Sequence, residues 1–390
     1  MNETIYMPVG EVCSSISDTY REKKNMVTLI NTSDVLEGRV LNHERVPNSN
    51  LKGQFKKTFQ RDDILYSEIR PQNRRFAYVD FSPIDYIAST KLMVIRAKKD
   101  VVSPKYLYYF LKNSSTVAEL QLLAETRSGT FPQITFSEVA NLTIPVPPLA
   151  VQEVIVQTMQ CLEDKTICNE QINDNLYEIV NAYYTSLFKD VECEMTTIGN
   201  YAERIYSGGT PTTSNAAYWD GTFGWFSSGE TRNRFVISTE KSITQTGIDN
   251  SSTKLASKHD IVMASAGQGF TRGQTSMLLI DTYVNQSVIV IHADRNILPY
   301  LFWNLANRYE ELRAISDSSS IRGSLTTKMI AAFEIPCANN DVIQTFSGFA
   351  WAVIPQIENN LLENERLAAL RDSLLPKLMT GEIDVSAIQL

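Results

Sequence analysis

Four short stretches of this 390-residue sequence combine arginine, glutamine, serine and glycine in a way that suits contact with nucleic acid bases. Two lie in the first half, at Arg70–Arg75 and Arg127–Gln133, and two in the second half, at Gln268–Arg272 and Ser319–Arg322. Arginine pairs with the edge of guanine and glutamine with the edge of adenine, each through two hydrogen bonds. Any one stretch taken alone is also compatible with a solvated surface loop, so that alternative stays open.

Further polar and aromatic residues extend these stretches. A basic cluster around Lys56 precedes the first, and the segment Ser207–Trp225 places a Gly-Gly-Thr-Pro turn before two tryptophans. Glycines there permit a positive φ angle or a close approach of the backbone to a ligand. The residues that we expect to contact DNA are Lys56, Lys57, Arg70, Arg74, Arg75, Arg127, Ser128 and Gln133 in the first half, and Thr210, Trp225, Arg232, Arg234, Gln268, Arg272, Ser319 and Arg322 in the second.

The sequence contains no set of residues typical of an enzyme. An N6-adenine methyltransferase needs an Asn/Asp-Pro-Pro-Tyr/Phe loop, and the nearest segment, Pro145–Pro148, lacks both the amide and the aromatic residue. The glycines of Ser265–Gly273 are spaced G-x-G-x-x-x-G with no Gly-Lys-Ser/Thr after them, which excludes the nucleotide-binding fingerprints. Scattered histidines and cysteines make a hydrolase or a zinc site unexpected. We therefore expect a non-catalytic chain with no cofactor or metal of its own.

The composition is that of a globular protein, with 43% hydrophobic and 21% charged residues. The chain has no run of about 18 apolar residues and no secretion pattern at its N-terminus, so we expect no membrane span and a cytoplasmic location. The net charge of −8 argues against binding nucleic acid through a general positive field. Local basic patches, completed by partner proteins, remain compatible with it.

A long helical pattern in the middle of the chain must position these loops. From Pro148 to Phe188 apolar residues recur every three or four positions, and no glycine or proline interrupts them after Pro148. A helix of about 40 residues would be about 60 Å long. Such a helix is either part of the core of one large domain or a spacer between two bodies, and we favour the spacer.

A similar pattern from Ile343 to Leu378 closes the chain. Polar residues interrupt the apolar stripe of both segments midway, at Thr166 and Asn169 in the first and at Asn360 and Asn364 in the second, a common device for fixing helix register. The two stripes can bury each other as an antiparallel coiled coil. Pro355 is expected to kink the second helix or to break it near Ile354.

The segments that precede the two helices also repeat, which indicates a tandem duplication. Matched motifs lie at a separation that shortens slowly along the chain, as it would if two diverged copies differed by small deletions. The matched pairs are Asp63 with Asp260 (260 − 63 = 197), Tyr106 with Tyr300 (300 − 106 = 194) and Ile144 with Ile335 (335 − 144 = 191).

Within the first copy, short β-like runs and one short helix predict an α+β fold. The expected strands are Val27–Ile30, Ile64–Ile69 and Lys91–Ile95, with a helix over Pro104–Lys112 and a last strand that ends at Ile144 because Pro145 follows. The expected domains are residues 1–147, a spacer helix over 148–189, residues 190–340, a second spacer helix over 341–379, and a tail over 380–390.

Four motifs in the chain resemble those of a known family. The motifs SGGTP, YWDGTFGWFSSGE, HDIVMASAGQGFTRG and LRDSLLPKLMTGEI resemble those of the specificity subunit of type I restriction–modification systems. The first half lacks the GGTP and YW motifs and instead carries NTSDVLEGRV and DDILYSEIRP, which look like another branch of the same domain family.

The resemblance implies a non-catalytic reader of double-stranded DNA with two target-recognition domains in tandem, each reading one half of a bipartite, asymmetric sequence. The paired helices would set the gap between the halves and dock two methyltransferase subunits, and restriction/translocase subunits would join them. S-adenosylmethionine, ATP and Mg²⁺ would belong to those partners. The competing interpretation is a scaffold that assembles partners through its long helices and reads no DNA. Polar loops at matched positions in both halves argue against it.

Overall fold

The computed structural model describes residues 4–22, 24–49, 53–127, 131–188, 194–267, 270–318 and 323–385. The chain divides into two compact units. The first unit contains Met1–Lys165 and Arg366–Leu390, and the second contains Thr166–Glu365. Each unit therefore holds one mixed α/β body together with a part of each of the two longest helices.

The described part of the first unit is built on two four-stranded sheets and two two-stranded ones. In one four-stranded sheet the order is β2 (Cys13–Ile16), β11 (Leu92–Ala97), β8 (Ile64–Ser67), β9 (Phe76–Tyr78); in the other it is β6 (Val46–Pro47), β3 (Met26–Ile30), β10 (Tyr86–Ser89), β7 (Phe55–Lys57). β1 (Ile5–Pro8) pairs with β12 (Thr143–Val146), and β4 (Val35–Leu36) with β5 (Arg39–Val40). The helical elements are α1 (Val9–Val12), η1 (Thr32–Asp34), η2 (Pro71–Asn73), α2 (Pro104–Lys112), α3 (Ser114–Arg127) and α4 (Phe136–Ala140).

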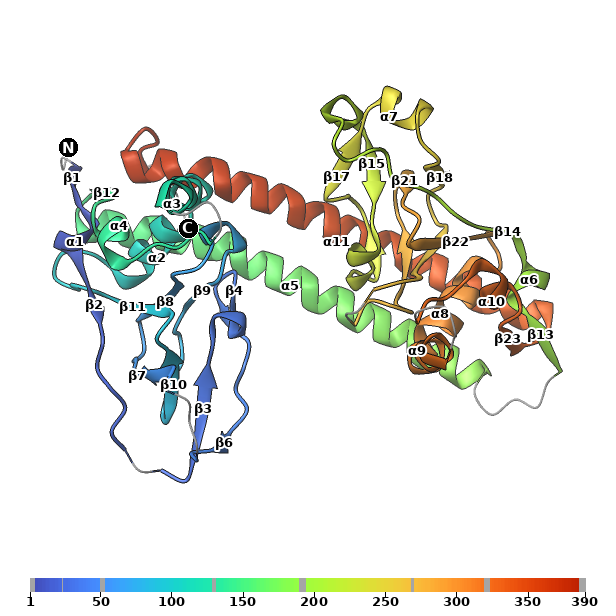
Figure 1. The fold of residues 1–390 in the computed structure, drawn as a ribbon, viewed down its shortest axis with the longest axis horizontal. Helices are drawn as coiled ribbons and strands as arrows, with labels where there is room; N and C mark the ends of the chain where they lie inside the picture. The colour runs from blue at the N-terminus through green and yellow to red at the C-terminus, as the bar shows by residue number, and fades with distance from the viewer. Residues whose placement is uncertain are drawn as a thin grey trace. The chain divides into compact units, whose positions relative to one another are not determined.

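The second unit repeats this plan (Figure 1). Its sheets run β14 (Ala202–Ser207), β22 (Val288–Ala293), β19 (Ile261–Ala264), β20 (Thr275–Leu278), β16 (Phe235–Val236), and β17 (Lys241–Ile243), β15 (Trp219–Phe226), β21 (Thr282–Val284), β18 (Lys254–Ala256), with β13 (Met195–Thr197) paired to β23 (Glu334–Pro336). The helical elements are α6 (Ile198–Tyr201), η3 (Ala216–Tyr218), η4 (Ser228–Arg232), α7 (Gln245–Asp249), α8 (Leu298–Asn307), α9 (Tyr309–Ser318) and α10 (Thr327–Ala331).

Strand pairing confirms the predicted duplication. The parallel pair β3–β10 of the first unit matches the parallel pair β15–β21 of the second, and antiparallel partners flank both pairs in the same order. The predicted helix over Pro104–Lys112 is observed as α2, and the expected strands near residues 27, 64 and 91 are β3, β8 and β11.

A buried acid holds the same place in each unit but has a different partner. Asp63 is fully buried and accepts two hydrogen bonds from the Arg96 guanidinium, both at 2.7 Å. Asp260 is 1% exposed and bonds to Nδ1 of His292 at 2.6 Å. A buried carboxylate without a partner is costly, so each unit provides its acid with a nitrogen donor. The donor is an arginine in the first copy and a histidine in the second.

Two long helices complete the fold, α5 over Leu149–Phe188 and α11 over Asn340–Thr380. In the first unit, Ile155 and Met159 of α5 share a core with Leu375 and Leu378 of α11. In the second unit, residues further along α5 contact residues earlier in α11, so the two helices run in opposite directions. The contacting pairs are Asn169 with Asn364, Asn173 with Asn360, and Tyr184 with Phe346. The predicted antiparallel packing is confirmed.

The structure contradicts two predictions about prolines. The predicted break near Ile354 does not occur, because α11 continues through Pro355, with Ile354 and Ile357 on either side 1% exposed in the core of the second unit. The predicted end of the last strand at Ile144 is wrong, because β12 continues through Pro145 to Val146 and pairs with β1 alone among the described strands. A strand paired on one side tolerates a residue that lacks an N–H donor.

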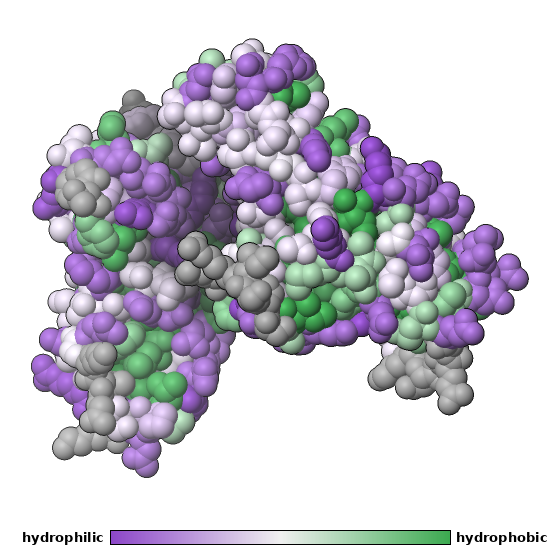
Figure 2. All heavy atoms as spheres, turned by 45° about the vertical axis from the view of Figure 1, so that its right-hand side comes forward, coloured by the Kyte–Doolittle hydropathy of each residue, from purple (hydrophilic) through white to green (hydrophobic). Residues whose placement is uncertain are grey.

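On the face that Figure 2 shows, polar residues predominate and hydrophobic residues gather in small patches between them. In the part of the chain that the structure describes, no helix combines the length and the apolar character needed to cross a bilayer.

Candidate nucleic-acid interface

The two arginine-bearing stretches of the first half come together in the first unit. The residues after β8 lie against those that precede α4, where Ile69 and Gln133 form a β-bridge. Two backbone hydrogen bonds fix the contact, from Arg70 N to Pro132 O at 3.1 Å and from Ile134 N to Glu68 O at 2.9 Å. The fold thus joins segments some 60 residues apart into one loop pair, of which Ser128 lies outside the described residues.

The three arginines of the first loop differ in their freedom. Arg70 is exposed and has a left-handed backbone with φ of 44°, as does Arg74 with φ of 51°. Arg74 donates to the Ser114 hydroxyl at 2.9 Å, and Arg75 donates to the carbonyl of Ser33 at 3.0 Å. Of the three, Arg70 is therefore the one presented to solvent, whereas Arg74 and Arg75 brace the loop.

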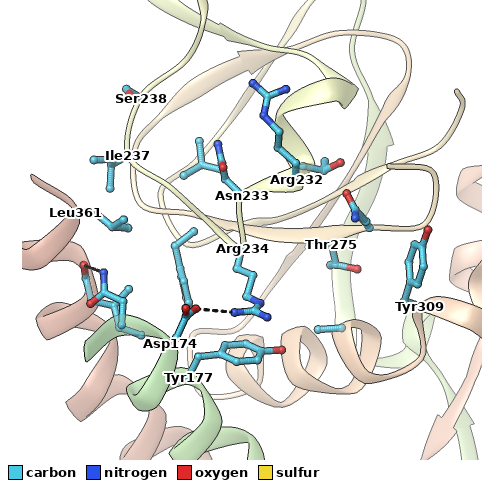
Figure 3. Close-up of a pocket in the computed structure, with 17 residues that line it drawn as sticks. Asp174, Tyr177, Arg232, Asn233, Arg234, Ile237, Ser238, Thr275, Tyr309 and Leu361 are labelled. Atoms are coloured by element: carbon cyan, nitrogen blue, oxygen red, sulfur yellow. Dashed lines mark hydrogen bonds and ion pairs between the residues drawn. The ribbon is translucent and has the colours of Figure 1, made fainter. Parts of the chain in front are cut away.

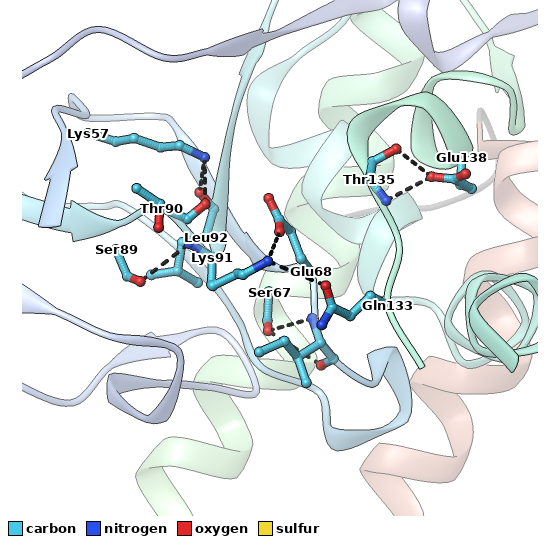
Figure 4. A network of polar contacts seen from close by, with 11 residues as sticks. Lys57, Ser67, Glu68, Ser89, Thr90, Lys91, Leu92, Gln133, Thr135 and Glu138 are labelled. Carbon is cyan, nitrogen blue, oxygen red and sulfur yellow. Dashed lines mark hydrogen bonds and ion pairs between the residues drawn. The ribbon is translucent and has the colours of Figure 1, made fainter. Parts of the chain in front are cut away.

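The second loop of this pair is held by acidic and basic neighbours (Figure 4). Gln133 accepts a hydrogen bond from the Lys91 ammonium at 3.3 Å, and the same ammonium contacts Glu68. At the end of α3, Arg127 forms an ion pair with Glu138. Burial raises the pKa of Glu138, but hydrogen bonds from Thr135 and the charge of Arg127 outweigh burial and lower it overall. Both predicted residues therefore have partners in the free chain that DNA must replace or accept.

Of the neighbouring lysines, Lys56 is exposed on β7, whereas Lys57 is half-buried. The Lys57 ammonium donates to the carbonyls of Thr90 and Leu92 at 3.1 and 2.8 Å (Figure 4). Burial lowers the pKa of Lys57, with the charge of Lys91 acting in the same direction. This geometry favours a structural role for Lys57 and leaves Lys56 as the available cation.

An equivalent loop pair exists in the second unit. Leu325 N donates to Ser265 O at 2.8 Å, the counterpart of the bond from Ile134 to Glu68. Arg272 joins the two loops, because its guanidinium pairs with Asp317 and donates to Gly323 O at 2.7 Å. The Arg272 side chain is only 11% exposed. Both terminal nitrogens of the Arg272 guanidinium thus have partners within the protein. The other predicted residues of this loop pair, Gln268, Ser319 and Arg322, lie outside the described residues.

Arg232 and Arg234 lie together at a cleft of the second unit with a volume of about 680 Å³. The Arg234 guanidinium stacks 4.3 Å from the ring centre of Tyr177 and pairs with Asp174 of α5 at 3.2 Å (Figure 3). Arg232 pairs with Glu240. All four charged side chains are more than half exposed, so these ion pairs are weak and both arginines stay accessible to a phosphate.

The Gly-Gly-Thr-Pro turn is a tightly packed structural feature. A Cβ added at Gly208 would lie 2.0 Å from Val284 O, so the backbone approaches β21 too closely for any side chain. Thr210 bonds to the side chain of Gln286. Trp225 is 5% exposed and donates to Gly209 O at 3.3 Å. This burial favours a structural role for Trp225, and we leave it out of the proposed interface.

Sequence reasoning missed several residues that the fold brings to these sites. Asn233, Gln274 and Tyr309 line the cleft beside Arg234. Phe270, between Gln268 and Arg272, is 83% exposed. Only Phe270 left a signal in the sequence, as an aromatic residue inside a glycine-rich loop. Among the described residues, no three His, Cys, Asp or Glu side chains are grouped so as to hold a metal ion.

Comparison with known proteins places these features in a family. The model of the type I restriction modification DNA specificity domain matches twice, over residues 6–178 and 191–341. The chain is 27% identical to the type I restriction enzyme HindI specificity subunit of Haemophilus influenzae, over 92% of this chain and 94% of that one. It is 26% identical to the EcoR124I/EcoR124II specificity subunit of Escherichia coli, over 71% and 68% of the two chains.

A solved structure has the same fold. The type I restriction–modification S subunit from M. genitalium superposes with a TM-score of 0.54 at 15% identity, covering 97% of this chain and 96% of that one. The relatives in sequence are specificity subunits, which are not themselves enzymes. The two loop pairs thus lie in two copies of a DNA-specificity domain, and this chain belongs to the type I restriction modification DNA specificity family as a non-catalytic subunit.

Proposed function

We propose that this chain selects the DNA target of a type I restriction–modification complex by reading a bipartite, asymmetric sequence. Each unit contacts one half of the target through its loop pair and through further basic side chains. Arg70 of the loop pair and Lys56 of β7 are available in the first unit, and Arg232 and Arg234 of the cleft in the second. The paired helices α5 and α11 set the number of unread base pairs between the halves.

One observation carries this proposal: the two units place a loop pair at the same point of the same fold but fill it with different residues. The bond from Ile134 to Glu68 in one unit and from Leu325 to Ser265 in the other fixes that equivalence. Equivalent positions with different side chains suit two readers of different sequences, because base specificity depends on the donors and acceptors that reach the groove.

The partners follow from the same proposal. Two methyltransferase subunits and the restriction/translocase subunits bind this chain, and they carry S-adenosylmethionine, ATP and Mg²⁺. The complex acts in the cytoplasm, where chromosomal and invading DNA are found. With a net charge of −8, this chain supplies base contacts while its partners supply much of the salt-dependent phosphate affinity.

The decisive experiment maps methylated adenines in host DNA with and without this chain, in cells that contain the methyltransferase subunit. We expect one bipartite motif that appears only when the chain is present. Arg70→Ala should then relax the motif on one side of its gap, and a combined Arg232→Ala and Arg234→Ala variant should act on the other side alone.

The scaffold interpretation makes a different forecast. If the chain only assembles its partners, loop variants leave the motif unchanged and alter at most the extent of methylation. A methylation pattern that does not depend on the chain at all would refute the proposed function.

A further inference from the structure

Phe270 has the highest exposed fraction, 83%, of any large hydrophobic side chain that the structure describes. It lies in the loop between β19 and β20, within the loop pair of the second unit. A single exposed apolar side chain is ordinary on a protein surface, but in a proposed binding loop it is available to an apolar group of the ligand.

The backbone that carries Phe270 is firmly anchored. The Tyr309 hydroxyl donates to Phe270 O at 2.6 Å, and Arg313 in turn donates to that hydroxyl at 3.0 Å. Gly273, with φ of +85°, turns the chain back, and its N–H donates to Ala264 O at 2.9 Å. The ring is therefore displayed from a fixed support on α9.

Among the described residues 270–273 of this loop segment, Phe270 is the exposed side chain that remains free to face a ligand, whereas the side chain of Arg272 is engaged within the protein. Arg272 is 11% exposed and occupied by Asp317 and Gly323, so it cannot also pair with a base. The Arg313 guanidinium lies 5.7 Å from the centre of the Phe270 ring. The Phe270 ring beside the Arg313 cation therefore complements a surface that is apolar at one point and anionic around it.

The loop pair of the first unit offers an independent parallel. Phe131 is 47% exposed and lies next to Pro132, whose carbonyl accepts from Arg70 N. By the separation of 191 residues that holds at this point of the repeat, Phe131 corresponds to Arg322 and not to Phe270 (131 + 191 = 322). The two pairs therefore display a phenylalanine from different loops, which repetition of the sequence alone does not explain.

We propose that Phe270 contacts the C5-methyl group of a thymine in the half-site read by the second unit. The thymine methyl is the apolar group that the major groove offers, and phenylalanine is among the side chains suited to it. This inference rests on the proposed function and assigns one specificity contact within it.

The test uses the complex of this chain with its methyltransferase subunit and the target found by methylation mapping. Each thymine of the half-site is replaced in turn by deoxyuridine, which removes only the methyl group. Wild-type complex should lose about fourfold in affinity at one position, the value of one buried methyl group. Phe270→Ala should bind the intact target more weakly and show no thymine preference there.

Matched variants separate contact from folding. Because the ring is 83% exposed, Phe270→Ala should keep the thermal midpoint of the wild-type chain. Phe270→Leu should retain part of the thymine preference, and Phe131→Ala should leave the half-site of the second unit unaffected.

Three results would overturn the inference. The first is a thymine preference that persists in Phe270→Ala, and the second is a half-site that contains no thymine. The third is a wild-type complex whose affinity does not change when thymine is replaced by uracil but which raises the fluorescence of 2-aminopurine in the half-site, because that signal marks a side chain inserted between bases. A wild-type complex with no sequence-specific binding would instead refute the proposed function, and this inference with it.

Discussion

The side-chain amide of Asn169 is fully buried and donates to the Asn364 side chain at 2.8 Å, which ties α5 to α11 in the second unit. A second bond of 2.8 Å runs from Asn360 to Asn173. Asn360 and Asn364 of α11 are the repeat counterparts of Asn169 and Asn173 of α5, since 360 − 169 and 364 − 173 each equal 191. The two asparagine pairs are therefore related by a local pseudo-twofold, as in an isologous interface.

Replacing Asn169 with leucine should destabilise the second unit. The change removes the two hydrogen bonds that the buried Asn169 amide donates to Asn364 and Glu363, which should cost about 1–3 kcal/mol. The Asn169→Leu/Asn364→Leu double variant should cost less than the sum of the single changes. Urea denaturation of all four chains gives the coupling energy, and strict additivity would show that the bond contributes nothing.

Lengthening both helices should widen the gap in the DNA target. Four residues added between Lys165 and Thr166, and four between Glu365 and Arg366, keep the contacts within each unit and add about 6 Å of helix. Because base pairs are spaced about 3.4 Å apart, the gap should grow by about two base pairs while both half-sites stay the same. Methylation mapping reads this directly, and an unchanged gap would exclude the helices as the ruler.

Arg70→Ala should weaken DNA binding without loss of stability. The side chain is exposed, and a surface change of this kind stays within about 0.5 kcal/mol in the free energy of unfolding. Loss of a paired base contact should cost about 1–3 kcal/mol on one half-site only. Arg75→Ala is the control, since it removes the bond to Ser33 O and should lower stability. An equal loss by Arg70→Ala on all sequences would assign Arg70 to phosphate.

Arg272→Ala should act mainly on folding, contrary to what the sequence indicates. The guanidinium links Asp317 and Gly323 O across the loop pair, and its removal should cost about 1–3 kcal/mol in stability. Asp317→Asn keeps an acceptor for the same bond and should cost less. A variant with wild-type stability but relaxed target choice would instead restore Arg272 to the set of base contacts.

His259 should make the second unit less stable as the pH falls. Burial, followed by the charges of Lys258 and Arg295, lowers the pKa of His259 from 6.5. Below pH 6.5 the unfolded chain takes up the proton more readily than the folded one, so stability present at pH 7 is lost as the pH falls toward the folded-state pKa.

The variant that tests this is His259→Asn, because asparagine tolerates the left-handed φ of 80° found at this position. Its stability should change less between pH 7 and pH 5 than that of the wild type. Measurements at pH 8, where histidine is neutral in both states, correct for the lost packing against Trp351. Parallel curves from pH 8 to pH 5 would refute the assignment.

The sequence was sufficient for the architecture because its signals are local and repeated. Unbroken apolar periodicity predicted α5 and α11, and matched motifs such as Asp63 and Asp260 predicted two units of one fold. Polar side chains were less predictable. Arg272 and its partner Asp317 are 45 residues apart, and Lys57 and the carbonyl of Leu92 are 35 apart. An exposed cation and one bound inside the protein look alike until folding brings the partner to it.

The mixed α/β body of the second unit begins at β13 and ends at β23, and these two strands pair with Met195 opposite Pro336. The first and last strands of this body therefore lie side by side. Recombination of the gene at these two strands could replace the whole body with that of another protein and leave both long helices intact. If each unit reads one half-site, as we propose, such recombination would give new combinations of half-sites with no need for gradual change of individual contacts.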